Sequence, residues 1–288
     1  MKKLLHIKRD FQPHWVGDGF PVRSLFSYHD DTAASDPFLL LDYAAPYEFA
    51  PGTAPRGVGE HPHRGFETVT IVYQGELEHR DSAGNRGSIG PGDVQWMTAA
   101  SGVVHEEFHS AAFTERGGTF EVAQLWVNLP AGEKMSPPRY QEIRDGDIPR
   151  AALGDGAGSA RIIAGELHGM RGPAKTVTPI NLWDLKLAAG GRVELPLPDE
   201  HTAMLVVQQG TVQLNDEQSA GGAALAQYDR AGDAISIHCT EVARALLLSG
   251  EPINEPVAGQ GPFVMNTREE IQQAIEDYRS GRMGSLGA

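Results

Sequence analysis

The sequence has a single cysteine, Cys239, and no long apolar segment among its 288 residues. One thiol cannot form an internal disulfide or a cysteine zinc site, and such sparing use of cysteine is typical of a reducing compartment. The apolar stretch near the N-terminus is interrupted by His6 and Lys8, which argues against a secretory signal. No run approaches the ~18 apolar residues of a membrane helix. We therefore expect a cytoplasmic protein without a membrane span.

Basic residues are also scarce. Lys and Arg number 24 against 38 Asp and Glu, which gives a formal net charge of −14. Binding to duplex nucleic acid requires clustered cations that displace counterions, and docking on anionic lipid requires cations too. We therefore expect neither direct nucleic-acid binding nor membrane binding, and any macromolecular partner is expected to be a protein.

Glycine and proline, by contrast, are frequent, and these 34 and 19 residues separate short apolar runs. This punctuation is typical of short strands joined by tight turns, so the sequence predicts a mainly β protein. The predicted strands cover residues 68–73, 120–129, 181–187, 203–208, 211–214, 234–238 and 242–248. One helix is predicted near the C-terminus, where residues 267–270 form a capping box and Ile271, Ala274, Ile275 and Tyr278 recur at helical spacing.

Two short segments recur in the same order in both halves of the chain. Residues 72–77 (VYQGEL) resemble residues 207–212 (VQQGTV) at an offset of 135, and residues 91–94 (PGDV) resemble residues 231–234 (AGDA) at an offset of 140. Glycine at such positions suits tight turns between strands. We therefore predict a duplicated β domain, with an N-terminal domain at residues 1–145 and a C-terminal domain at residues 146–288 that carries the helix.

Five of the eleven histidines lie within 49 residues, where an even distribution would place about two; they are His61, His63, His79, His105 and His109. Alternate residues of a strand face the same side, so His61 and His63 can approach one ion, as can His105 and Glu107. Two such pairs on neighbouring strands would supply three imidazoles and one carboxylate. Nitrogen and oxygen donors without thiolate suit iron, manganese, nickel, cobalt or zinc.

The residue pattern leaves the carboxylate ligand open. Glu67 has the same parity as His61 and His63, so on an unbroken strand it would face the same side. Either Glu67 or Glu107 can therefore complete the site. The second half of the chain has only isolated histidines, such as His201 and His238, and is expected to be metal-free.

Longer motifs around these residues resemble the pirin family of bicupins. The segment HPHRGFET at residues 61–68 and the segment PGDVQWMTA at residues 91–99 carry the resemblance. Further matches lie at residues 36–40 (DPFLL), 125–129 (LWVNL) and 261–267 (GPFVMNT). The resemblance runs from about residue 20 to about residue 280, and its strings are long and specific.

The resemblance implies two tandem cupin, jelly-roll-like β-barrels, with one metal in the N-terminal barrel and a metal-free C-terminal barrel. The ligand positions of the family match His61, His63, His105 and Glu107, which selects Glu107 by analogy and leaves Glu67 outside the ligand set. The metal expected from the family is Fe(II), with Zn, Mn, Ni, Co or Cu also accommodated.

The activity implied by the resemblance is that of a quercetin 2,3-dioxygenase, which opens a flavonol ring with dioxygen. Glu107 is then the expected catalytic residue, which accepts the flavonol proton if it shifts off the ion. Phe66, Trp96, Met97 and Phe108 are expected to line the pocket for the planar substrate. The alternative is a non-catalytic regulatory metal-binding protein, a transcriptional cofactor or a regulator of metabolic enzymes, that acts through protein partners.

Overall fold

The computed structural model describes residues 1–287, which fall into two compact units. The first unit comprises residues 12–145 and the C-terminal residues from 253 onward, and the second comprises residues 1–11 and 146–252. The chain passes between the units at the predicted boundary of 145 and 146. At both ends of the chain, however, this division differs from the predicted domains 1–145 and 146–288.

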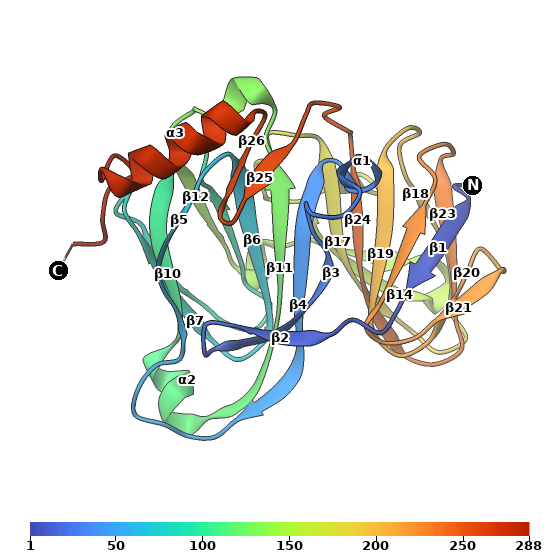
Figure 1. The fold of residues 1–288 in the computed structure, drawn as a ribbon. Helices are drawn as coiled ribbons and strands as arrows, with labels where there is room; N and C mark the ends of the chain where they lie inside the picture. The colour runs from blue at the N-terminus through green and yellow to red at the C-terminus, as the bar shows by residue number, and fades with distance from the viewer. Residues whose placement is uncertain (288) are drawn as a thin grey trace. The chain divides into compact units, whose positions relative to one another are not determined.

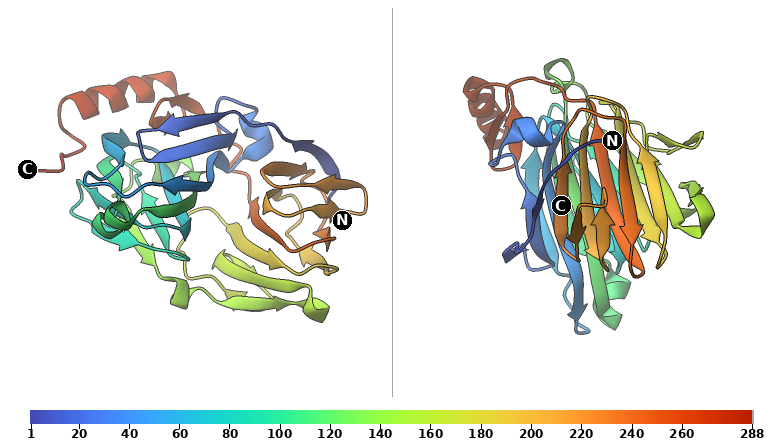
Figure 2. Two further views of the ribbon diagram at one scale, coloured as in Figure 1. Left: turned by 90° about the horizontal axis from the view of Figure 1, so that it is seen from below. Right: turned by 90° about the vertical axis from the view of Figure 1, so that its right-hand side faces the viewer.

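Each end of the chain belongs to the unit formed by the other half of the sequence, and each case has a physical reason. Near the N-terminus, strand β1 (Leu4–Lys8) pairs with β22 (Ala224–Tyr228) at the edge of a sheet in the second unit, and Leu4 is buried there. At the other end, helix α3 (Arg268–Arg279) buries Ile271 and Ala274 against Val104 of the first unit. Figures 1 and 2 show β1 in dark blue and α3 in red. The predicted C-terminal helix therefore exists, but it belongs to the unit of the N-terminal half.

The first unit consists of two antiparallel sheets. The larger sheet has the order β12 (Arg139–Ile143), β9 (Val94–Thr98), β6 (Phe66–Gln74), β11 (Gly118–Asn128), β4 (Phe38–Phe49), β3 (Phe20–Phe26) and β2 (Pro13–Val16). The smaller sheet has the order β5 (Gly57–His63), β10 (Val103–His109), β7 (Leu77–Asp81) and β8 (Arg86–Ile89). A ribbon of β25 (Ala258–Gln260) and β26 (Phe263–Met265) and the short helices α1 (Thr32–Ser35) and α2 (Ala111–Arg116) complete the unit. Part of its core lies between the sheets, where Val72 and Phe120 of the larger sheet cluster with Leu77 and Ile89 of the smaller one.

The second unit repeats this arrangement. Its larger sheet has the order β1, β22, β19 (Thr202–Gln209), β24 (Ala243–Gly250), β17 (Ile180–Leu187), β14 (Gly158–Ala164) and β13 (Arg150–Leu153). Its smaller sheet has the order β18 (Arg192–Pro196), β23 (Ala234–Cys239), β20 (Val212–Leu214) and β21 (Gln218–Ala220), and β15 (Glu166–Leu167) pairs with β16 (Met170–Arg171). Leucine, isoleucine and valine from both sheets fill the core between them.

The order of the strands tests the predicted repeat. Gly75 (φ 88°) and Gly210 (φ 74°) occupy corresponding turns, after β6 and after β19, so the first match pairs equivalent positions. The second match does not. Gly92 lies between β8 and β9, whereas Gly232 lies between β22 and β23, one turn later in the repeat. The duplication is present, but the GD dipeptides align by chance because many turns need the left-handed conformation that glycine adopts at low cost.

The prediction of a mainly β protein with one longer helix near the C-terminus is confirmed. Within residues 1–287, no helix is both long and apolar enough to cross a membrane.

Candidate metal centre

Three of the predicted ligands come together at one end of strands β5 and β10. These strands pair so that His61 lies directly opposite His105 and His63 opposite Val103. The imidazole centroids are 4.3 Å apart for His61 and His105, and 4.8 Å apart for each of the other two pairs. One ring nitrogen from each histidine lies within 4.8 Å of the other two, which is close enough for a single ion to be shared.

Glu107 lies two residues farther along β10, on the face that carries His105. Its Oε2 accepts a hydrogen bond of 3.0 Å from Gln124, and its Oε1 is 3.5 Å from the Thr70 hydroxyl. In this geometry a carboxylate oxygen of Glu107 and one ring nitrogen each of His105 and His79 lie within 4.8 Å of one another. His105 is thus common to both groups of potential ligands. The pairing of β5 with β10 is irregular between His105 and Glu107, because one extra residue lies on β5 there. Such bulges redirect side chains next to functional sites.

The buried imidazoles carry nitrogen atoms without partners among the described residues. Nε2 of His105 and Nδ1 of His63 are buried and neither accept nor donate a hydrogen bond within residues 1–287. Burial, followed by the neighbouring histidines, holds the pKa values of both rings well below the ordinary value. Neutral imidazole is the form that binds metal ions. His61 is less buried, and its Nδ1–H donates to the carbonyl of Gly59 at 2.8 Å, which leaves Nε2 free for an ion.

Glu67 lies on the face of the larger sheet that points away from the three histidines. The turn at Arg64 and Gly65 separates β5 from β6, so the parity of residues 61 and 63 does not continue into β6. On β6 it is Phe66 that contacts the His63 ring, with centroids 5.1 Å apart. Glu67 instead accepts a hydrogen bond of 2.6 Å from Thr98, and burial raises its pKa to about 7. The assumption of an unbroken strand is therefore wrong, and Glu67 lies outside both groups of potential ligands.

Of the four aromatic and apolar residues expected to line the pocket, only Phe66 contacts a predicted ligand in the described interactions. Trp96 shares the face of Glu67, and Met97 packs with Ala99 and Val103. Phe108 lies on the outer face of β10, opposite to His105. Trp126, which was not predicted as a site residue, stacks on Phe66 at 4.2 Å and meets the His63 ring edge-on at 5.3 Å. Phe66 and Trp126 thus form an aromatic wall beside the histidines.

Comparisons with known proteins agree with this architecture. The family model Pirin matches residues 19–127, and the model Pirin C-terminal cupin domain matches residues 182–284. A Pseudomonas aeruginosa protein named "Putative quercetin 2,3-dioxygenase" is 56% identical over 282 residues, with 98% of each chain covered. The chain belongs to the pirin family.

Other members of the pirin family extend the comparison. Pirin of Mus musculus is 40% identical over 258 residues, which cover 88% of this chain and 84% of the mouse protein. The crystal structure of a quercetin 2,3-dioxygenase from Acinetobacter baumannii is 52% identical, covers 100% of both chains and matches with a TM-score of 0.97. The prediction of two cupin domains is confirmed.

The second cupin unit of this pirin has apolar residues at the positions that correspond to the cluster. Strand order and register match β5 with β18, β7 with β20, and β10 with β23. The residues that correspond to His61, His63, His79, His105 and Glu107 are then Leu195, Leu197, Leu214, Ile235 and Ile237, and all five are buried. Both groups of potential ligands found within residues 1–287 lie in the first unit. A metal-free second unit stays a prediction, supported by this substitution of donors by aliphatic side chains.

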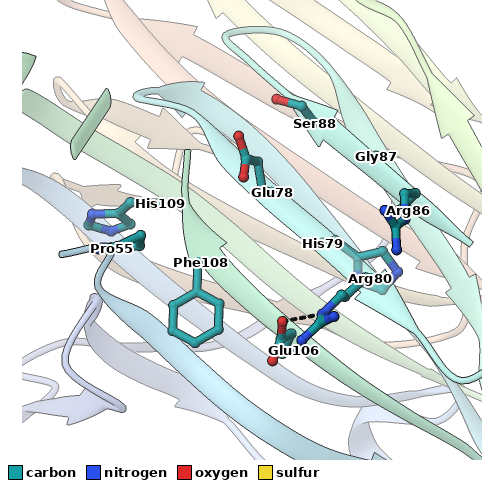
Figure 3. A pocket seen from close by; sticks show the side chains of 10 residues that line it. All are labelled: Pro55, Glu78, His79, Arg80, Arg86, Gly87, Ser88, Glu106, Phe108 and His109. Carbon is teal, nitrogen blue, oxygen red and sulfur yellow. Dashed lines mark hydrogen bonds and ion pairs between the residues drawn. The ribbon is translucent and has the colours of Figure 1, made fainter. Parts of the chain in front are cut away.

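A shallow pocket of about 600 Å³ lies on the outer face of the smaller sheet (Figure 3). Arg80 and Glu106 form an ion pair across its floor, and Phe108 and Pro55 add apolar surface. The side chains at positions 78, 80, 106 and 108 alternate with the inward residues His79, His105 and Glu107. His79 and His109 also line the pocket, but His61, His63 and His105 do not, so it is separate from the three-histidine cluster.

The turn that follows His63 is fixed by the C-terminal segment of the first unit. The backbone of Arg64 is hydrogen-bonded to Pro262 and Val264, and its guanidinium forms an ion pair of 2.7 Å with Asp277 of α3. Lys134, which is buried, donates to the carbonyls of Gly65 and Val264 at 2.7 and 3.1 Å. These contacts explain why residues 261–267 and the turn at residues 64–65 form one structural element despite their separation in sequence.

Proposed function

We propose that this pirin binds one divalent metal ion, iron(II), through His61, His63, His105 and Glu107, and that it opens the ring of a flavonol with dioxygen as quercetin 2,3-dioxygenases do. The observation that carries the proposal is the convergence of three imidazoles, two of which have a buried nitrogen without a partner among residues 1–287. The similarity to the relatives named for this activity supports the reaction type.

The donor set fits the proposed ion. Three neutral imidazoles and one carboxylate offer nitrogen and oxygen donors without thiolate, which suits iron(II) and also accommodates Zn, Mn, Ni, Co or Cu. Glu107 lies on the same face of β10 as His105, two residues along, and in this proposal a change of its side-chain rotamer turns the carboxylate toward the ion held by the histidines. An ion that prefers six donors keeps positions open for exchangeable ligands when the protein supplies four.

The side chains around the site have distinct roles in this proposal. When bound, the ion supplies Lewis acidity and redox capacity for dioxygen. In the rotamer in which Gln124 donates to its Oε2, off the ion, Glu107 accepts the proton of the flavonol 3-hydroxyl. The wall of Phe66 and Trp126 stacks against the planar flavonol and orients it. One flavonol and one dioxygen then yield one depside and one carbon monoxide, which balances all atoms.

The test is turnover of quercetin by the protein reconstituted with iron(II), followed by loss of flavonol absorbance and release of carbon monoxide. His61→Ala is the site variant, and His14→Ala, which changes an exposed histidine on β2, is the matched control. Turnover in wild type and His14→Ala but not in His61→Ala supports the proposal. Absence of turnover by wild-type protein with iron demonstrably bound would instead assign the metal a non-catalytic role.

A further inference from the structure

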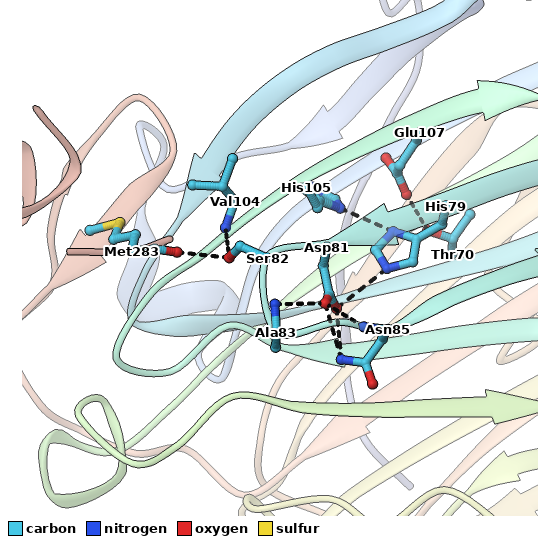
Figure 4. Close-up of polar contacts among 10 residues, drawn as sticks. All are labelled: Thr70, His79, Asp81, Ser82, Ala83, Asn85, Val104, His105, Glu107 and Met283. Atoms are coloured by element: carbon cyan, nitrogen blue, oxygen red, sulfur yellow. Dashed lines mark hydrogen bonds and ion pairs between the residues drawn. The ribbon is translucent and has the colours of Figure 1, made fainter. Parts of the chain in front are cut away.

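A buried histidine that is not among the proposed ligands, His79, contacts Nδ1 of His105, the ring nitrogen that is not assigned to the ion. His79 lies on β7 directly opposite Glu107 of β10, and its side chain points to the inner face of the smaller sheet. Its Nδ1 is 3.3 Å from Nδ1 of His105, and the two ring centroids are 5.3 Å apart (Figure 4). Tyr140 stacks on the His79 ring at 5.2 Å and an interplanar angle of 5°.

Asp81 faces the other nitrogen of the same ring. Its Oδ2 lies 3.5 Å from Nε2 of His79, a charge contact and not a hydrogen bond, and both side chains are 1% exposed. The carboxylate is itself held by the backbone N–H groups of Ala83 and Asn85 and by the Asn85 amide, at 2.9 to 3.1 Å. The turn at residues 81–85 thus fixes the carboxylate in place (Figure 4).

These contacts favour one arrangement of the protons on the two rings. The negative charge of the carboxylate beside Nε2 favours, for a neutral ring, the tautomer of His79 with its hydrogen on Nε2 and with Nδ1 as the acceptor. The contact between the two Nδ1 atoms then requires His105 to donate from Nδ1–H. The lone pair of His105 is therefore on Nε2, which is the buried atom without a partner among the described residues. His61 reaches the same state by donating from Nδ1 to the Gly59 carbonyl.

We propose that His79 and Asp81 are positioning residues that hold His105 as the Nδ1–H tautomer, with Nε2 directed at the metal ion. The inference rests on the proposed metal site and deepens it. A metal-binding imidazole commonly donates its second N–H to a carboxylate or carbonyl, which fixes the ring and makes it a better ligand. Here a second imidazole links the ligand to the carboxylate, so Asp81 acts on His105 through His79, which lies two residues before it on β7.

The corresponding positions of the second unit argue for this pairing of roles. Leu214 stands where His79 does, and Ile235 stands where His105 does. The second unit thus has an aliphatic side chain in place of the His79 ring, as it has in place of the candidate ligands. A histidine kept only to fill the core has no need of an acidic partner, whereas a tautomer-directing histidine does.

Affinity for cobalt(II) and nickel(II), measured by competition with a chromophoric chelator, tests the proposal. His79→Leu removes the acceptor, His79→Gln retains an amide oxygen that can accept from His105, and Arg80→Leu is the matched control one residue away on the outer face. We expect His79→Leu to weaken binding by roughly 10- to 100-fold, His79→Gln to recover most of that loss, and Arg80→Leu to bind as wild type does. The cobalt absorption spectrum should shift only in His79→Leu.

A measurement on the metal-free wild-type protein does not depend on the folding of any variant. Long-range proton–nitrogen NMR correlations report the tautomer of each histidine, and we expect His105 as Nδ1–H and His79 as Nε2–H. The opposite tautomer of His105, an unchanged affinity in His79→Leu, or a ring nitrogen of His79 bonded to the ion in a metal-loaded crystal structure would overturn the inference. Wild-type protein that binds no metal would overturn the proposed function, and the NMR result separates that failure from failure of the tautomer assignment.

Discussion

Replacing Asp277 with alanine tests whether its ion pair with Arg64 anchors α3 on the turn that follows His63. The carboxylate accepts from the Arg64 guanidinium at 2.7 Å and also from Gln273 and Arg282. Arg64 is only 4% exposed and follows His63 directly. Asp277→Ala therefore leaves a buried cation whose guanidinium keeps its bond to the carbonyl of Ser101 at 2.7 Å.

The size of the effect follows from this burial. Removal of one partner from a fully buried ion pair costs ~3–5 kcal/mol. Because Arg64 keeps its bond to Ser101 and the Asp277 carboxylate is partly open to solvent, we expect about 2–3 kcal/mol in the free energy of local opening of α3. Such a loss corresponds to amide hydrogen exchange that is roughly 30- to 150-fold faster.

Hydrogen exchange followed by mass spectrometry measures this opening segment by segment. We expect faster exchange in α3 and in the ribbon of β25 and β26, and unchanged exchange in the second unit. Gln272→Ala, an exposed substitution on the same helix, is the control and should exchange as wild type does. Wild-type exchange of α3 in Asp277→Ala would refute the reasoning that this ion pair anchors the helix.

Three further predictions concern the ligands, the aromatic wall and pH. His61→Ala and His105→Ala should each lower the bound metal measured by mass spectrometry to near zero while the circular dichroism of the β structure persists, because the second unit has aliphatic residues in place of the ligands. Trp126→Ala should raise KM for quercetin by about tenfold, the loss of one aromatic stacking contact, with metal content unchanged. Burial raises the pKa of Asp277, but hydrogen bonds from Arg64, Gln273 and Arg282 outweigh this effect and lower the pKa to about 2. This folded pKa lies below that of an unfolded aspartate, so the ionised carboxylate stabilises the fold. The difference in unfolding free energy between wild type and Asp277→Ala, measured in urea, should therefore be complete above about pH 4 and should shrink as the pH falls toward 2.

The pairs of candidate ligands were predictable because their geometry is local. Two residues at positions i and i+2 share a face wherever the segment is extended, so HPH and HEE each identify a pair without knowledge of the fold. That the two pairs face each other depends on the pairing of β5 with β10, across more than 40 residues, which the residue pattern allowed but did not require. The β character and the C-terminal helix were predictable for the same local reasons.

The wrong or missing predictions concern residues whose position depends on a turn or on a partner that is distant in sequence. Arg64 and Gly65 form the turn between β5 and β6. Because of this turn, Glu67 does not face the same side as His61 and His63. Trp126 enters the site because β11 pairs with β6, and nothing in the LWVN string distinguishes an inward tryptophan from a core one. The C-terminal helix packs on the first unit because Arg64 and Val104 offer partners for Asp277 and Ile271, a complementarity that is invisible without the strand order.

The central claim is that the ion held beside Glu107, and not one held by Glu67, performs the chemistry. Iron content and carbon monoxide release from quercetin, measured on the same preparations of wild type, Glu107→Gln and Glu67→Gln, test it most directly. We predict that Glu67→Gln keeps both, since the amide oxygen introduced by this substitution can still accept from Thr98, and that Glu107→Gln loses bound iron and carbon monoxide together. Turnover at the wild-type rate by Glu107→Gln, or loss of iron in Glu67→Gln alone, would contradict the account.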